Sequence, residues 1–204
     1  MFSGASCIDG ATGEPALSNL PFTYEGPAPT CPAYVRPTQT PSRPNELATD
    51  YEYVLYDGAH LVRPSNDAHT TGVLYRAEFD RTWKHFTSHG HAPVGACLDR
   101  PLVVSGNGVV YLAASLFESY GRHEYWVYRA LVEQALESCL PERRLIRTGP
   151  AWVEATLHAQ GRMSVADSYV VNLTAYQPRR SASPVPRVDE SGLTAGVSLS
   201  LLPD

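Results

Sequence analysis

Apolar and polar positions follow two different periods along the chain, and each period predicts a different element. In residues 101–112, two runs rich in valine flank a Gly-Asn-Gly sequence. This pattern is typical of a β-hairpin, because the turn needs positive φ angles that glycine and asparagine tolerate. From about residue 124 to 139, apolar side chains recur every three or four positions, which predicts a helix with one buried face. We expect this helix to end before Pro141 and to cover the hairpin.

Further strands are predicted on both sides of this unit. Residues 51–56, 61–62 and 72–79 have strand composition, and an Asp57-Gly58 turn follows the first of them. Residues 153–159, 169–174 and 197–201 alternate apolar with polar side chains, as strands with one buried face do. Residues 150–204 are therefore expected to form half of an antiparallel sandwich.

Prolines are concentrated at the start of the chain. Eight of the 17 prolines precede residue 50. Because proline lacks a backbone donor and fixes φ, we expect residues 1–50 to form an extended arm without regular strands or helices. The arm is either a disordered leader or a segment that docks Phe22 and Tyr34 on a neighbouring domain. We predict an α+β protein with this arm, a central domain at 51–149 and a truncated β domain at 150–204.

Composition excludes several classes of partner. The formal net charge of −5 and the lack of basic runs beyond Arg179-Arg180 give no reason to expect nucleic acid. No apolar stretch approaches the roughly 20 residues that a membrane helix needs. The four cysteines stand far apart, and residues 1–7 do not resemble a secretory signal. We therefore expect reduced, mostly buried thiols, a cytoplasmic location, no membrane association and no cofactor.

Residues 80–93 form the stretch richest in chemically capable side chains. Asp80 is a candidate N-cap for one or two helical turns. On such a helix, His85 and His89 would share one face at a spacing that zinc sites use, and His91 could supply a third ligand. No glutamate or cysteine stands in the expected register, so we expect no metal and histidines that hydrogen-bond neighbouring loops or line a polar interface.

Other catalytic motifs are absent from the sequence, or their residues lack a local pattern that would identify them. The sequence has no Gly-x-Ser-x-Gly elbow, and the Gly-Asn-Gly sequence precedes no helix that could bind phosphate. Sugar hydrolysis requires two carboxylates across the scissile bond. Four acidic residues are available without a context that marks them, and five aromatic residues could stack on sugar rings or be buried. The acidic residues are Asp57, Glu78, Asp80 and Asp99, and the aromatic residues are Trp83, Tyr120, Tyr125, Trp126 and Trp152.

Several motifs, taken in order, resemble the C-terminal portion of a family of bacterial glycoside hydrolases. The most extended are Phe79-Asp-Arg-Thr-Trp-Lys-His-Phe-Thr-Ser-His89, Gly108-Val-Val-Tyr-Leu-Ala113, Leu145-Ile-Arg-Thr-Gly-Pro150, Glu154-Ala-Thr-Leu-His158, Val170-Val-Asn-Leu-Thr-Ala-Tyr176 and Val197-Ser-Leu-Ser-Leu201. The family comprises α-L-fucosidase-like hydrolases that carry a β-galactosidase trimerisation-type domain behind a catalytic (β/α)8 barrel. The likeness covers most of residues 50–202.

The resemblance implies a non-catalytic accessory or assembly role, because the cleaving carboxylates of such enzymes lie on the barrel. It also implies that residues 51–149 are the last part of a glutamine-amidotransferase-like α/β domain, and that the chain is truncated at both ends. The expected partners are a glycoside hydrolase catalytic domain or a second copy of the chain, with carbohydrate as a further ligand. The candidate sugar-binding residues are Arg81, Trp83, His85, His89 and His91. The alternatives are a carbohydrate-binding module and a small metal-dependent hydrolase that uses the three histidines.

Overall fold

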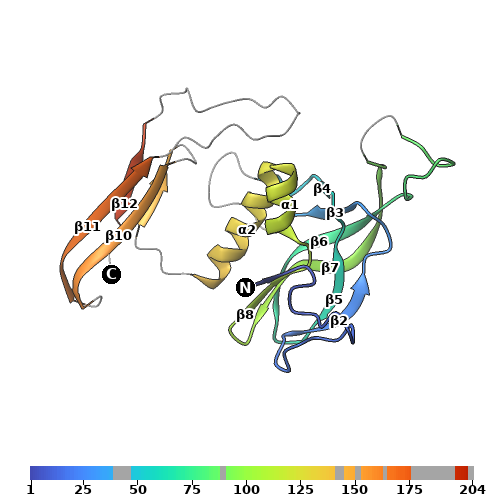
Figure 1. The fold of residues 1–204 in the computed structure, drawn as a ribbon, viewed down its shortest axis with the longest axis horizontal. Coiled ribbons are helices and arrows are strands. Elements are labelled where there is room, and N and C mark those ends of the chain that lie inside the picture. Colours follow the sequence, from blue (N-terminus) through green and yellow to red (C-terminus); the bar gives the residue numbers. More distant parts are fainter. Residues whose placement is uncertain are drawn as a thin grey trace. The chain divides into compact units, whose positions relative to one another are not determined.

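A curled six-stranded sheet organises the first of the two units into which the chain divides, Met1–Leu140 and Pro141–Asp204 (Figure 1). The computed structural model describes residues 1–38, 47–87, 91–140, 145–149, 153–162, 165–175 and 196–201. The elements of the first unit are β1 (Phe2–Ser3), β2 (Phe22–Pro27), β3 (Ala33–Arg36), β4 (Tyr53–Leu55), β5 (His60–Pro64), β6 (His69–Ala77), β7 (Val94–Gly106), β8 (Val109–Leu112), α1 (Leu116–His123) and α2 (Trp126–Cys139).

The strand order of this sheet is β1-β8-β7-β6-β3-β4, and β2 and β5 form a separate antiparallel ribbon. Every pair in the six-stranded sheet is antiparallel except β1 with β8. The predicted hairpin is confirmed: β7 and β8 pair antiparallel and are joined by Asn107 and Gly108, whose φ angles are 51° and 73°. These positive angles are what a two-residue hairpin turn requires.

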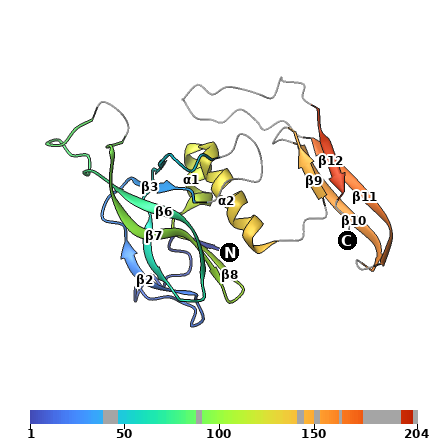
Figure 2. The ribbon, with the colours of Figure 1, turned by 180° about the vertical axis from the view of Figure 1, so that it is seen from behind.

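The predicted helix is also confirmed, as α2, and its apolar face joins the core of the sheet. Val127, Tyr128 and Leu131 are buried in one cluster with Tyr111 and Leu112 of β8. Figure 2 shows α1 and α2 lying beside each other. Helix α1 was not predicted. Neither described helix is long and apolar enough to cross a bilayer.

The predicted α+β class, with a glutamine-amidotransferase-like remnant, is wrong, because the described residues form a β-rich fold in which strands far outweigh the two helices. An α/β domain alternates parallel strands with crossover helices. Here, the strands from β3 to β8 follow one another without an intervening helix, and the two helices come consecutively after them. The helical period of α2 was predicted correctly. A single helix next to a hairpin, however, does not distinguish an α+β protein from a β-rich one.

The expectation that residues 1–50 avoid regular strands is wrong as well. β3 pairs with both β4 and β6, and Ala33 and Val35 are fully buried. The prolines next to β3 lie outside the strand: Pro32 precedes β3 and Pro37 follows it. A proline at either end of a strand removes no hydrogen bond from its middle, so it leaves the pairing intact.

The second unit contains β9 (Leu145–Thr148), β10 (Val153–Arg162), β11 (Val165–Ala175) and β12 (Ser198–Leu201). β10 pairs antiparallel with β11, and β9 pairs antiparallel with β12. In β10, Val153 and Leu157 are less exposed than the polar residues between them, as the alternation predicted. In β11, Val170 and Leu173 are half-exposed. Strand β9 was not predicted. The described strands form two separate two-stranded sheets, and the half-sandwich stays a prediction.

Candidate functional site

The β6–β7 loop, residues 78–93, carries all five of the predicted sugar-binding residues. Its base is closed by a hydrogen bond of 2.9 Å from the Glu78 N–H to the Pro93 carbonyl. Further along, Thr82 and His85 exchange two backbone hydrogen bonds, so the loop turns sharply between them. Ser88, His89 and Gly90 lie outside the described residues. The part of the loop up to Thr87 forms bends and no helix, so the predicted helix that begins at Asp80 is wrong.

Asp80 has a different role from the predicted cap. Its Oδ1 atom accepts a hydrogen bond of 3.0 Å from the backbone N–H of Cys31, which ties the loop to the segment before β3. A second tie comes from Tyr34 of β3, whose hydroxyl donates to the carbonyl of Ala92. The two contacts fix both ends of the loop to the sheet.

The loop is aromatic and basic at its most exposed point. The Trp83 side chain is 87% exposed and that of Phe86 is 73% exposed. The Lys84 Nζ atom lies 5.1 Å from the centre of the Trp83 ring, and the Arg81 guanidinium lies 5.5 Å from that of Phe86. A contact between a cation and an aromatic ring at an exposed site is only weakly stabilising. These contacts therefore do not explain why two large rings are exposed.

The described histidines of the loop have different aromatic neighbours. The His85 ring lies 5.6 Å from Phe79, whereas the His91 ring packs edge-on against Tyr34 and Tyr56. In the part of the chain that the structure describes, no three His, Cys, Asp or Glu side chains come close enough to hold a metal ion. Because His89 is outside that part, the three-histidine array itself remains a prediction.

Tyr56 connects this loop to helices α1 and α2. Its ring lies 5.9 Å from His91, 5.0 Å from His123 and 6.0 Å from Tyr125. Tyr125 in turn lies edge-on against Trp126, whose side chain is 47% exposed. The result is a continuous row of partly exposed aromatic rings, two of which, Tyr125 and Trp126, were candidates from the sequence.

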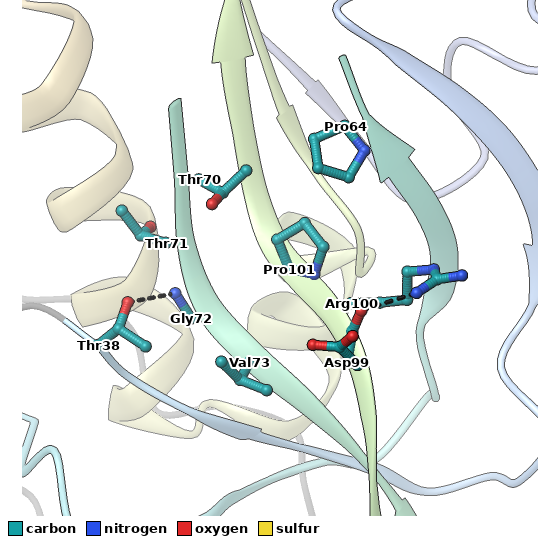
Figure 3. Close-up of a pocket in the computed structure, with 9 residues that line it drawn as sticks. All are labelled: Thr38, Pro64, Thr70, Thr71, Gly72, Val73, Asp99, Arg100 and Pro101. Atoms are coloured by element: carbon teal, nitrogen blue, oxygen red, sulfur yellow. Dashed lines mark hydrogen bonds between the residues drawn. The ribbon is translucent and has the colours of Figure 1, made fainter. Parts of the chain in front are cut away.

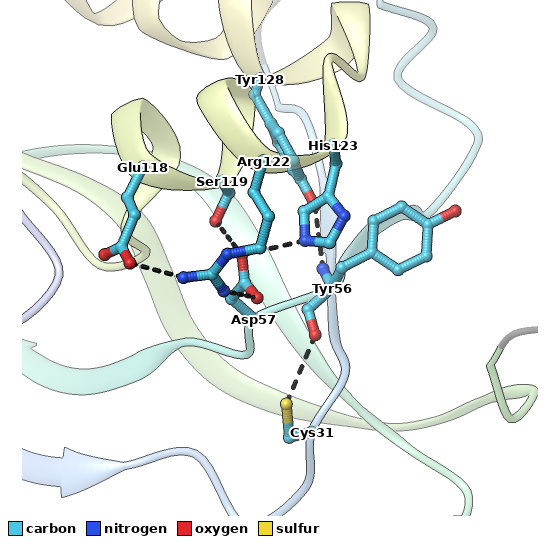
Figure 4. A network of polar contacts seen from close by, with 8 residues as sticks. All are labelled: Cys31, Tyr56, Asp57, Glu118, Ser119, Arg122, His123 and Tyr128. Atoms are coloured by element: carbon cyan, nitrogen blue, oxygen red, sulfur yellow. Dashed lines mark hydrogen bonds and ion pairs between the residues drawn. The ribbon is translucent and has the colours of Figure 1, made fainter. Parts of the chain in front are cut away.

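A polar network centred on Asp57 lies directly beside Tyr56 (Figure 4). The Asp57 Oδ2 atom accepts a hydrogen bond of 2.7 Å from the Ser119 hydroxyl and lies 3.1 Å from His123 Nε2. The Oδ1 atom accepts a bond of 2.5 Å from Arg122, which also reaches Glu118 four residues earlier. Helix α1 is therefore docked on the β4–β5 turn by a single carboxylate.

This network does not have the arrangement of a nucleophilic triad. In a triad the histidine stands between the nucleophile and the acid, whereas here Ser119 and His123 both contact the acid itself. Burial raises the pKa of the nearby Cys31 thiol, and the charges of Asp57 and Asp80 raise it further. A raised thiol pKa disfavours the reactive thiolate. The network is built to hold a helix, and neither hydroxyl nor thiol is activated.

The carboxylates with resolved pKa shifts do not match a sugar-cleaving acid. Partial burial opposes ionisation of Asp57, but hydrogen bonds from Ser119 and His123 outweigh it, so the pKa of Asp57 is lowered. The hydrogen bond from Arg100 lowers the pKa of Glu25. A general acid in a glycoside hydrolase needs a raised pKa.

One sequence motif that predicts part of this network was overlooked. Ser115 followed by Glu118 is the spacing of a capping box, which marks the start of a helix. Reading it would have predicted α1 and placed Ser119, Arg122 and His123 on it. Nothing local in the sequence indicates that Asp57 would be their partner.

A separate pocket of about 340 Å³ lies between the middle parts of β6 and β7 (Figure 3). Thr38, Thr70 and Thr71 line one side of the pocket, and Asp99 and Arg100 lie across from them. The pocket uses none of the five predicted sugar-binding residues.

Comparison of the chain with protein-family models and with curated proteins finds no match. Among solved structures, α-L-fucosidase isoenzyme 2 from Paenibacillus thiaminolyticus is similar, with a TM-score of 0.71 and 27% sequence identity. The chain resembles part of a fucosidase. The match covers 88% of this chain but only 26% of the fucosidase chain. The resemblance inferred from the sequence is thus supported at the level of an α-L-fucosidase-like protein.

Proposed function

We propose that this chain is a non-catalytic accessory part of a carbohydrate-cleaving glycoside hydrolase of the α-L-fucosidase type. The observation that carries the proposal is the similarity to about a quarter of the Paenibacillus α-L-fucosidase, which spans nearly all of this chain. The lowered pKa values of Asp57 and Glu25 support an accessory role, because neither carboxylate suits proton donation to a glycosidic oxygen.

The β6–β7 loop is the part that we propose to contact the catalytic domain or its substrate. Arg81, Trp83 and His85 lie on its exposed portion, and His91 lies closer to β7, whereas His89 is outside the described residues. Large exposed aromatic rings next to cationic side chains are frequent on surfaces that bind another protein. The partner is the catalytic barrel of a fucosidase. This barrel lies either on a separate chain or in a second copy of the assembled enzyme.

The test replaces the matching quarter of the Paenibacillus α-L-fucosidase with this chain and measures hydrolysis of 4-nitrophenyl α-L-fucoside. The isolated 204-residue chain is expected to show no turnover, and the chimera to recover activity that the truncated fucosidase lacks. Turnover by the isolated chain, or an inactive chimera that is folded and correctly assembled, would contradict the proposal.

The loop is tested in the same chimera. Alanine at His85 together with His89 should lower the activity, and alanine at Tyr51, an exposed aromatic residue outside the loop, should not. Unchanged activity of the double variant would exclude the loop from the site. Zinc analysis of the purified chain tests the metal-dependent alternative, which requires one bound metal per chain.

A carbohydrate-binding module is the second candidate, favoured by the row of aromatic rings from Tyr56 to Trp126. Stacking of sugar rings on such side chains would give measurable affinity for glycans without a catalytic domain. Binding of simple glycans by the isolated chain that Trp126→Ala abolishes, combined with an inactive chimera, would favour this candidate over the accessory role.

A further inference from the structure

The pairing of β6 with β7 is irregular beside the mid-strand pocket. Val73 pairs with Pro101, and Tyr75 pairs with Cys97, so a step of two residues on β6 is matched by a step of four on β7. The extra residues form a bulge that includes Asp99, whose φ of 52° is left-handed. Bulges re-aim side chains and are frequent next to binding sites. Here, the bulge turns Asp99 and Arg100 out of the ladder.

The charged groups of Arg100 and Asp99 differ in their hydrogen-bond partners. The Arg100 guanidinium donates to both carboxylate oxygens of Glu25 on β2, at 2.5 and 3.2 Å, and Glu25 also pairs with Arg63 at 2.6 Å. It also donates to the backbone carbonyl of Asp99, which fixes the bulge. Among the described residues, none donates a hydrogen bond to the Asp99 carboxylate, and this carboxylate is directed into the pocket (Figure 3).

The other walls of the pocket combine hydroxyls with apolar faces. Thr38 already accepts the N–H of Gly72 through its Oγ1 atom at 2.9 Å, and this holds the hydroxyl in place. The Thr70 hydroxyl is directed toward the pocket, while the rings of Pro64 and Pro101 provide C–H surface (Figure 3). The volume of about 340 Å³ falls at the small end of ligand pockets, which span about 300–1,000 Å³.

We propose that this pocket binds a neutral polyhydroxylated ligand, a mono- or disaccharide, through the carboxylate of Asp99. An ionised carboxylate only accepts hydrogen bonds, so it selects a ligand with adjacent hydroxyl donors. It repels anions, and a single carboxylate without further acidic partners is a poor site for a divalent cation. The threonine hydroxyls can donate or accept, and the proline rings suit the C–H face of a sugar. The choice of a carbohydrate rests on the proposed function, whereas the pocket itself does not depend on it.

The experiment titrates the full 204-residue chain with L-fucose, D-galactose and 2′-fucosyllactose, following binding by calorimetry and by amide chemical shifts. At least one sugar is expected to bind saturably. Asp99→Asn should weaken that binding about tenfold, the loss expected for one charge-assisted hydrogen bond. Asparagine tolerates the left-handed conformation, so this variant keeps the bulge. Thr70→Val should weaken binding by a smaller factor, and Asp67→Asn, an exposed change outside the pocket, should leave it unchanged.

The outcomes separate this proposal from the proposed function. Binding that Asp99→Asn leaves unchanged, or that only Trp83→Ala or Trp126→Ala removes, would overturn the pocket even if the fucosidase chimera is active. Absence of saturable binding, or stronger binding of inorganic phosphate than of any sugar, would also overturn it. Sugar binding that depends on Asp99 in a chain that fails to restore the chimera would support the pocket and contradict the accessory role.

Discussion

The carboxylate of Asp57 accepts a hydrogen bond of 2.7 Å from the hydroxyl of Ser119, which lies 62 residues further along the chain. Asp57 is in the turn between β4 and β5, and the buried Ser119 is on α1. The bond therefore joins the edge of the sheet to a helix that follows all the strands of the first unit. Removing the donor leaves the docking to Arg122 and His123, both of which are more exposed to water.

Ser119→Ala should lower the free energy of unfolding by about 1 kcal/mol, the typical net contribution of one hydrogen bond. For a protein of this size, the melting temperature should fall by about 2–4 °C. Thermal unfolding followed by circular dichroism measures the change. Ser105→Ala is the matched control, because Ser105 is half-buried in β7 and makes no side-chain hydrogen bond to Asp57; an equal loss in both variants would contradict the role of Asp57.

The same carboxylate should give the protein an acid-sensitive component of stability. Partial burial raises its pKa, but the bonds from Ser119 and His123 and the charge of Arg122 dominate, so the folded pKa lies below the ordinary value of 3.8. A lowered folded pKa stabilises the folded state above pH 3.8, and this stability is lost as the pH falls through the folded pKa. Urea unfolding from about pH 3 to pH 6 should therefore show a smaller dependence on pH in Asp57→Asn than in the parent chain.

Gly72→Ala is expected to destabilise the first unit more than a change at another left-handed glycine. Gly72 has a φ of +71°, and a Cβ there would lie 3.1 Å from Leu102 Cβ and 3.2 Å from Val35 Cγ2. The strain of a left-handed alanine and the overpacking together should cost about 2–3 kcal/mol. Gly108→Ala has a similar φ of +73° with nothing within 4 Å, so it measures the strain alone. Equal losses of unfolding free energy in the two variants would show that packing at Gly72 is unimportant.

The elements that were predicted correctly are those whose signal is local. The turn at Asn107 and Gly108 and the apolar face of α2 are both written in a few consecutive residues, and both are present in the structure. The arrangement of β3 was missed, because its position between β4 and β6 depends on pairing partners far along the chain. Proline content suggested irregular structure there, although the prolines only border the strand.

In the candidate site, too, some features could be predicted from the sequence and others could not. The exposed aromatic and basic composition of residues 81–86 could be read directly, since no buried period runs through them. The contacts of Asp57 with α1 and the bulge that turns Asp99 out of β7 could not be read, because they depend on which strands and helices meet. A helical spacing of histidines was misleading, since Asp80 bonds to Cys31 before β3 and the described backbone up to Thr87 forms bends, not helical turns.

Trp83→Ala and Phe86→Ala should leave the free energy of unfolding of the isolated chain within about 0.5 kcal/mol of the parent, because both rings are largely exposed. In the fucosidase chimera, the same variants should weaken assembly or raise KM for the fucoside. Tyr51→Ala, with a ring 63% exposed outside the loop, controls for loss of an aromatic surface residue. A large loss of stability in the isolated chain would show that the rings belong to its own core.

Tyr34→Phe tests whether the base of the β6–β7 loop must be held for the tip to act. Tyr34 is buried, its hydroxyl donates to the Ala92 carbonyl, and its ring packs on His91. Phenylalanine keeps the ring and leaves that carbonyl without its donor, so the unfolding free energy should fall by about 1–2 kcal/mol.

Hydrogen exchange should show faster opening of the amides at the loop base, Glu78 in particular, whose N–H bonds to Pro93. In the chimera, Tyr34→Phe should then reduce activity although Tyr34 itself is too buried to contact a partner. Tyr111→Phe is the matched control, since it also removes a buried tyrosine hydroxyl, but one that donates to the Gly4 carbonyl and not to the loop. A loss of activity specific to Tyr34→Phe would mean that the loop acts as a preorganised element, and equal losses in the two variants would mean that stability alone accounts for it.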